Sequence, residues 1–293
     1  MANHDVAYYN EDAALSGALQ TVVAAKIGMA WPKGLERVLS ISGDISWSEL
    51  MEKQTIMLQN HDLGPAEAGA LALVARCSEQ LKEIDVFGNP IGAIGVTLIA
   101  DAIRDHPDKC TRLNVRCTGA GPQGGKALAA ALRTPGCALT YLNVEYNQLD
   151  EPGLTDLFSA LPQCGLMELD AKWNNAGNQG ARACAEALAA PNGTLQRLNL
   201  LQCSLTDDQA ENIAAGLAAS RSIEVLDLSE NRYGLKGHEA ICKAAISCMT
   251  LKSIKIDLPE GVDGGDVVKT AAAREPPLQV QLVEKKPAST GSS

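Results

Sequence analysis

Hydrophobic residues recur along most of the chain with a period of 27 to 29 residues. The repeated units start at Lys53, Leu81, Cys110, Leu139, Leu166, Leu195, Ile223 and Leu251. If each start is position 1 of its unit, positions 4 and 6 are apolar in every unit. So regular a spacing predicts copies of one structural unit, stacked along a single axis.

Within each unit the hydrophobic period changes. Positions 4 and 6 lie two residues apart, as on one face of a strand, whereas positions 15, 19 and 23 share one face of a helix. In the unit that starts at Leu81 these positions hold Ile84, Val86, Gly95, Ile99 and Ile103. Each unit is therefore predicted to be a strand, a turn and a helix, and the strands to form a parallel sheet.

Asparagine and glycine hold fixed places in the predicted turn. Position 9 is Asn89, Asn147, Asn174 and Asn231 in four of the units, and an Asn amide there can bond the backbone of the turn. Glycine recurs at positions 12 and 15, where the chain turns and the helix packs closely. We expect the asparagines to link neighbouring coils.

The pattern L-x-x-L-x-L-x-x-N-x-L-G-x-x-G, followed by a helical second half, resembles the ribonuclease-inhibitor-like subclass of leucine-rich repeats. The resemblance covers residues 53 to about 257. It implies an α/β fold, a right-handed leucine-rich-repeat solenoid bent into a horseshoe arc, with the parallel sheet on the concave face and the helices on the convex face. It specifies a fold and not an activity.

Both ends of the chain depart from the repeat, as expected of units that cover the last apolar layers of a solenoid. The predicted parts are an N-terminal helical arm (1–30), an N-terminal cap (31–52), about eight repeats (53–258), a C-terminal capping helix and strand (259–284) and a disordered tail (285–293). The tail is polar and rich in small residues, which favours disorder.

Local signals predict the elements of the two caps. Residues 36–41 are expected to form a strand with Leu39 and Ile41 pointing inward, and Ser46 with Glu49 to open a short helix as a capping box. Residues 267–274 are expected to form the last convex helix. The alternating apolar residues from 278 to 282 are expected to form a closing strand.

Composition and charge narrow the possible partners. Only 3% of the residues are aromatic against 46% hydrophobic, so the core must consist of aliphatic layers. The net charge of −10 opposes binding to nucleic acid, which needs Lys and Arg gathered on one face. No apolar run reaches membrane-spanning length and the first residues lack the pattern of a secretory signal. We expect a cytoplasmic protein without membrane insertion; a cytoskeletal or ciliary assembly and import into an organelle stay open.

Cysteine usage indicates reduced thiols. The nine cysteines are an odd number and include no C-x-x-C pair, which argues against a disulfide framework or a zinc site. Cys110, Cys184 and Cys203 fall on inward positions of the repeat, where a small buried thiol is ordinary. Cys117 stands at position 8 and is the thiol expected to be most exposed.

Two motifs resemble ligand sites, but the repeat explains both. Residues 119–124 match G-x-G-x-x-G, yet two of these glycines are positions 12 and 15 of the repeat, and Pro122 lacks an amide that a phosphate would use. The helix at His238 begins like that of a zinc protease, but Cys242 stands where the second His is required. No cofactor, metal or catalytic residue is predicted.

The concave sheet is the surface where a partner is expected to bind. Positions 3, 5 and 7 project from the strands, and position 8 lies at their ends. The candidate protein-binding residues are Phe87, Arg112, Arg116, Tyr141, Tyr146, Lys172, Trp173, Arg197 and Leu201. Tyr146 and Trp173 share position 8 in adjacent units, so they can form a contiguous aromatic anchor. The basic residues around them suit carboxylates on a partner. Alternatively, Trp173 packs only on the turn of its own coil.

These patterns favour a non-catalytic protein–protein interaction scaffold, or a subunit of a larger protein assembly, that binds one or more proteins. The alternative is a GTPase-activating protein resembling the Ran GTPase activator. That family shares this repeat type and supplies an arginine from near the start of the solenoid. Arg37 and Arg76 are the only early arginines here.

Overall fold

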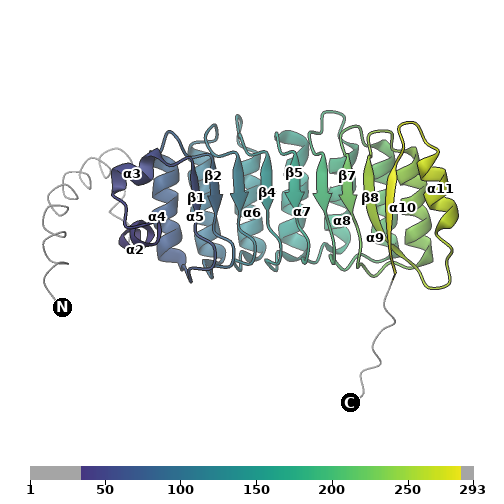
Figure 1. The fold of residues 1–293 in the computed structure, drawn as a ribbon, viewed down its shortest axis with the longest axis horizontal. Helices are drawn as coiled ribbons and strands as arrows, with labels where there is room; N and C mark the ends of the chain where they lie inside the picture. Colours follow the sequence, from purple (N-terminus) through teal and green to yellow (C-terminus); the bar gives the residue numbers. More distant parts are fainter. Residues whose placement is uncertain (1–33, 285–293) are drawn as a thin grey trace, which may run out of the picture.

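The structure, a computed structural model, describes residues 34–284, which form one row of strand–helix units (Figure 1). The strands are β1 (Thr55–Met57), β2 (Glu83–Asp85), β3 (Arg112–Asn114), β4 (Tyr141–Asn143), β5 (Glu168–Asp170), β6 (Arg197–Asn199), β7 (Val225–Asp227), β8 (Ser253–Leu258) and β9 (Gln279–Glu284). The helices that follow β1 to β8 are α4 (Pro65–Cys77), α5 (Gly92–Asp105), α6 (Gly121–Leu132), α7 (Asp150–Ala160), α8 (Gly177–Ala189), α9 (Asp207–Ala219), α10 (Leu235–Ser247) and α11 (Gly265–Ala272). A short 3-10 helix, η1 (Leu161–Gln163), extends α7.

All of these strands lie in one parallel sheet, in the order of the sequence. Ile56 pairs with Ile84, and Ile84 with Leu113, which is the register that the repeat predicted. The helices form a second layer behind the sheet (Figure 1). Neighbouring strands lie about 4.8 Å apart and packed helices about 8–10 Å apart, so the sheet takes the inner, concave side of the arc. The predicted leucine-rich-repeat solenoid is confirmed.

The core consists of thin aliphatic layers between the sheet and the helices. At positions 4 and 6 of the repeats no side chain is more than 2% exposed. Cys110, Cys184 and Cys203 are buried in the same layers, as expected. Burial raises the pKa of Cys110 and of Cys203 to about 12, so both thiols stay protonated at neutral pH.

The asparagines at position 9 bind successive units together. The Oδ1 atom of Asn147 accepts hydrogen bonds from the backbone N–H groups of Thr118 and Ala120 in the preceding unit, each at 3.0 Å. Its Nδ2 atom donates to the carbonyl of Val115 in that unit at 2.7 Å and to Val144 in its own unit at 3.0 Å. Equivalent bonds to both units are made by Asn89, Asn174 and Asn231. The expected link between coils is confirmed.

Glycine at two helix positions sets how closely adjacent helices approach. A Cβ atom added to Gly125 of α6 would lie 2.9 Å from the Cα atom of Gly153 in α7. One added to Gly216 of α9 would meet backbone atoms of Ala185 in α8 at 2.5 Å or less. Because the obstacles are backbone atoms, these contacts cannot be relieved by turning a side chain.

At the N-terminal cap the expected strand is wrong. Residues 36–41 belong to a helix, α2 (Leu35–Ile41), which follows Gly34 in the left-handed conformation at φ 93°. Leu35 and Val38, three residues apart, are its fully buried side chains, so a helical period outweighs the alternation that suggested a strand. The next helix, α3 (Trp47–Glu52), does begin with the predicted capping box.

At the C-terminal cap the expected elements are confirmed. Helix α11 covers most of the residues predicted to be helical, and β9 pairs with β8 as the closing strand. In place of a further asparagine, the buried carboxylate of Asp257 accepts the N–H groups of Glu230 at 2.6 Å and Asn231 at 2.9 Å. The domain boundaries stay a prediction, and the arm at 1–30 and the tail at 285–293 lie outside the described residues.

Candidate protein-interaction face

Side chains from positions 3, 5 and 7 form three rows across the open face of the sheet, because the strands pair in register. The position-3 row is Glu83, Arg112, Tyr141, Glu168 and Arg197. The position-5 row is Asp85, Asn114, Asn143, Asp170, Asn199 and Asp227. The position-7 row is Phe87, Arg116, Glu145, Lys172 and Leu201. Each row crosses five or six consecutive strands or strand ends, so it presents a continuous polar surface with few apolar side chains.

The position-7 row is a chain of contacts around one carboxylate. Glu145 is 5% exposed, and its Oε2 atom lies 3.0 Å from Nε of Arg116 and 3.2 Å from Nζ of Lys172. The guanidinium carbon of Arg116 lies 4.7 Å from the centroid of the Phe87 ring, within reach of a cation–π interaction. At the far end, Leu201 occupies the strand next to Lys172 and is half-buried. Glu145 is not among the residues predicted from the sequence, although its place between two basic positions of the row was a usable signal.

The position-3 row repeats this arrangement nearer the start of the strands. Arg112 lies 3.3 Å from the carboxylate of Glu83, and its guanidinium carbon lies 4.0 Å from the centroid of the Tyr141 ring. Arg197 lies 3.7 Å from the carboxylate of Glu168. Burial of Tyr141 raises the pKa of its hydroxyl, which therefore stays protonated.

Every basic residue predicted on this face thus has a carboxylate of the same chain beside it. For Lys172, partial burial alone would lower the pKa, but the charges of Asp170 and Glu145 outweigh burial and raise the pKa. Exposed ion pairs each contribute about 0–1 kcal/mol to stability, so a partner's carboxylates could replace Glu83 or Glu168 at little cost, whereas the buried Glu145 would be left without its partners at a higher cost. The three rows carry six acidic and four basic side chains, so the face is mixed in charge with a slight acidic excess rather than basic.

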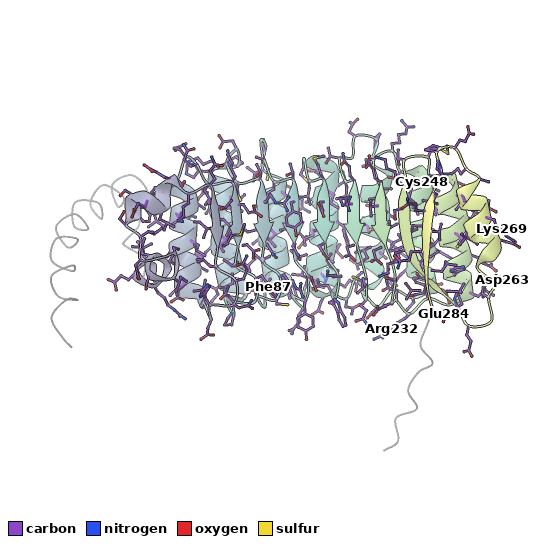
Figure 2. All side chains as sticks on the ribbon, viewed as in Figure 1. Phe87, Arg232, Cys248, Asp263, Lys269 and Glu284 are labelled. Atoms are coloured by element: carbon purple, nitrogen blue, oxygen red, sulfur yellow. The ribbon has the colours of Figure 1, made fainter. Side chains whose placement is uncertain are left out.

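The C-terminal ends of the strands carry the exposed aromatic side chains. Tyr146 is 56% exposed and Trp173 is 45% exposed, and their rings meet edge to face with centroids 6.3 Å apart and planes at 64°. We call this pair the aromatic rim. The C-terminal ends of the strands lie along the edge of the sheet that Figure 2 marks with Phe87, Arg232 and Glu284, opposite the edge marked by Cys248. The two rings are contiguous, as predicted.

The backbone at the rim adopts a conformation that is unfavourable for large side chains. Position 8 is left-handed in consecutive units, with φ of 53° at Cys117, 53° at Tyr146, 60° at Trp173 and 53° at Gln202. The preceding unit has Gly88 at the same position with φ 73°. Left-handed backbone costs an L-residue about 1–2 kcal/mol relative to glycine, so Tyr146 and Trp173 reduce stability here unless other contacts offset that cost.

Residues of both ligand-like motifs make contacts within the solenoid. In residues 119–124 the amide of Gly121 donates to the carbonyl of Asn147 at 3.0 Å, so the turn is used to join repeats. Cys242 Sγ lies 3.4 Å from Nε2 of the buried His238, and burial raises the pKa of the thiol to about 11, away from a reactive thiolate. Across residues 34–284 no group of three or more His, Cys, Asp or Glu is placed to hold a metal ion.

The two early arginines are engaged within the chain. Arg37 donates to the carbonyl of His61 at 2.8 Å and lies 3.5 Å from the carboxylate of Glu67. Arg76 donates through Nε to Asp105 at 2.9 Å. Arg37 lies on α2 of the N-terminal cap and Arg76 in the last turn of α4, so neither belongs to the three rows of the open face, and nothing in their geometry favours the GTPase-activating alternative.

Comparison with known proteins agrees with the repeat geometry. A family model described as a leucine-rich repeat matches residues 78–100. Ribonuclease inhibitor from Sus scrofa is 25% identical over 222 residues, which cover 66% of this chain and 49% of that protein. The chain is a leucine-rich-repeat protein of the ribonuclease-inhibitor-like kind. Proteins built from such repeats generally mediate binding between proteins.

Other matches of this leucine-rich-repeat protein cover different shares of the two chains. The human NACHT, LRR and PYD domains-containing protein 13 is 36% identical over 135 residues, which cover 46% of this chain and 13% of that protein. A chain of the yeast Rad7 and Elc1 complex covers 88% of this chain at 12% identity with a TM-score of 0.48. The chain spans about half the length of the ribonuclease inhibitors that it matches.

Within the described part of the chain, no helix is both long and apolar enough to cross a membrane.

Proposed function

We propose that this chain is a non-catalytic interaction protein that binds a protein partner through its concave sheet face and the aromatic rim. The observation that carries the proposal is the rim itself. Tyr146 and Trp173 hold large rings in solvent at positions where left-handed backbone favours glycine or asparagine. Exposed Tyr and Trp are the residues that most often dominate binding energy in protein interfaces.

The rows beside the rim suit the border of such an interface. Their charges are preorganised by contacts between adjacent strands, so a partner need not order them on binding. The name ribonuclease inhibitor describes relatives that act on another protein, which supports a protein as the partner class. We further propose that the chain acts in the cytoplasm as a scaffold or as a subunit of a larger assembly, without nucleic acid as a partner.

The test is affinity capture from cell extract with quantitative mass spectrometry. The bait variants are Tyr146→Asn and Trp173→Asn, because asparagine tolerates left-handed backbone and so limits the effect on folding. Loss of an aromatic hot spot costs about 2 kcal/mol or more, which corresponds to roughly a 30-fold weaker partner affinity. We expect the specific partners to be depleted to a similar degree with either variant.

The matched control is Leu235→Asn. Leu235 is a large apolar side chain, 50% exposed, at the start of α10 in the helix layer rather than on the sheet. We expect this variant to capture the partners as the unaltered chain does. Undiminished capture by both rim variants, or equal loss with the Leu235 variant, would show that the rim is not the binding surface. Urea denaturation of each bait separates lost binding from lost folding.

A further inference from the structure

The last strand of the solenoid leaves one long edge of the sheet open. β9 runs over Gln279–Glu284 and pairs with β8 along its whole length, whereas the strands from β1 to β7 are three residues long. Within residues 34–284 no strand lies beyond β9 (Figure 1, yellow strand). This end therefore presents the longest exposed strand edge of the described chain.

The apolar layer at this end is incompletely covered. Val280 and Leu282 pair with Ile254 and Ile256 of β8, so they occupy positions 4 and 6 of a ninth unit. Ile254 and Ile256 are 1% and 0% exposed, whereas Val280 and Leu282 are only half-buried. Nearby, Val268 of α11 is 40% exposed. One further strand along β9 would complete the layer.

The backbone of β9 has N–H and C=O groups on its outer edge that can pair with a further strand. The N–H of Gln279 donates to the carbonyl of Lys252, just before β8, at 3.0 Å. Successive residues of a strand point their N–H and C=O groups to opposite edges, so those of Val280 and Leu282 point away from β8. In earlier units the equivalent of Leu282 donates to the next strand, as Leu228 does to Lys255 at 2.8 Å. The outward groups of Val280 and Leu282 are the ones available for a new strand.

The side chains of β9 do not protect this edge. Natural edge strands commonly carry a charge, a proline or a bulge that blocks pairing with another chain. From Gln279 to Val283 the strand has none of these, and the first charge comes at Glu284. We propose that β9 pairs antiparallel with β9 of a second copy of this chain, so that two solenoids join end to end.

Self-pairing fits one register particularly well. With the two-fold axis at Gln281, Val280 lies opposite Leu282 of the partner subunit on the core side, and Gln279 lies opposite the partner's Val283 on the open face. The two Gln281 side chains then meet across the axis, where their amides can bond each other. Moving the axis to Leu282 would place Glu284 opposite Val280, inside the strand, whereas with the axis at Gln281 it lies opposite Leu278, just outside the strand. The first register pairs uncharged residues from Gln279 to Val283.

A two-fold axis closes the assembly at two copies, because the same edge is used on both sides. The axis stands perpendicular to the joined sheet, so both concave faces lie on one side of the dimer. The two aromatic rims lie on opposite edges, because the strands run in opposite directions. The dimer thus presents two copies of the proposed binding surface.

Charge exchange at Gln281 tests the pairing without disturbing the core, because this side chain is exposed. The full chain, Gln281→Lys and Gln281→Glu are compared by sedimentation velocity over a concentration series reaching hundreds of micromolar. We expect the unaltered chain to shift from 30.8 kDa towards twice that mass. Each variant alone is expected to associate at least 10-fold more weakly, and an equimolar mixture of the two to recover the dimer.

Gln54→Lys is the matched control, since Gln54 is an exposed glutamine just before β1, at the other end of the sheet. It should dimerise as the unaltered chain does. A chain that stays monomeric throughout the series would overturn the proposal. So would association that survives both Gln281 variants, a mixture that does not recover, or disruption by Gln54→Lys, which would indicate head-to-tail stacking.

Discussion

Replacing Asn147 by alanine tests how the repeats are held together. The side chain is fully buried, and its Oδ1 atom is the acceptor for the N–H groups of Thr118 and Ala120. The carbonyls that its Nδ2 atom reaches keep a second donor, because Thr118 also donates to Val115 and Asn174 also donates to Val144. The substitution therefore leaves two buried N–H groups unpaired. At about 1–3 kcal/mol each, the expected loss of stability is about 2–6 kcal/mol.

Urea denaturation followed by circular dichroism at 222 nm measures this loss. The control is Asn175→Ala in the next turn, since Asn175 is exposed and its replacement should change the free energy of unfolding by less than about 0.5 kcal/mol. A loss below about 1 kcal/mol for Asn147→Ala would mean that the position-9 asparagines do not join the coils as described. A loss equal to that of the control would lead to the same conclusion.

Three further predictions follow from local geometry. In urea denaturation the free energy of unfolding of Trp173→Gly should exceed that of Trp173→Ala by about 1 kcal/mol, because φ is 60° at this position. The reverse order would contradict a strained backbone at Trp173. Gly216→Ala should destabilise by about 1–3 kcal/mol because the new Cβ meets backbone of α8, whereas Gly180→Ala, with neighbours no nearer than 3.6 Å, should be neutral or stabilising by up to about 1 kcal/mol. Because burial holds the pKa of the Cys110 and Cys203 thiols near 12, stability is retained below the unfolded thiol pKa near 8.5 and is lost as pH rises towards 12. At pH 10 the loss is on the order of 2 kcal/mol per thiol, so equal urea midpoints at pH 8 and pH 10 would contradict it.

The sequence was sufficient to predict the register of the sheet. Positions 4 and 6 are apolar in every repeat, and a strand that slipped by one residue would turn both into solvent, so one pairing is strongly preferred. The position-9 asparagines were equally informative, because a buried amide must find partners and the turn supplies them. Because positions 4 and 6 point into the core, the alternation along each strand places the nine candidate residues on the opposite face or at its edge.

Other features depend on interactions between units. The ion pair of Glu145 with Arg116 and Lys172 joins three strands, and no single unit contains it. The left-handed backbone at Tyr146 and Trp173 is imposed by the bonds between coils and contradicts local preference. Residues 36–41 were wrongly predicted as a strand, because six residues are too few to separate a helical period from a strand alternation.

Site-specific photocrosslinking tests most directly the claim that the aromatic rim is the binding surface. A photoreactive amino acid is placed at one of two positions. Gln202 is the position-8 residue of the unit after Trp173, and Ile94 of α5 is 67% exposed on the convex layer. The account predicts a covalent adduct with a partner protein from Gln202, none from Ile94, and loss of the adduct when Trp173→Asn is added. An adduct formed only from Ile94, or equally from both positions, would contradict it.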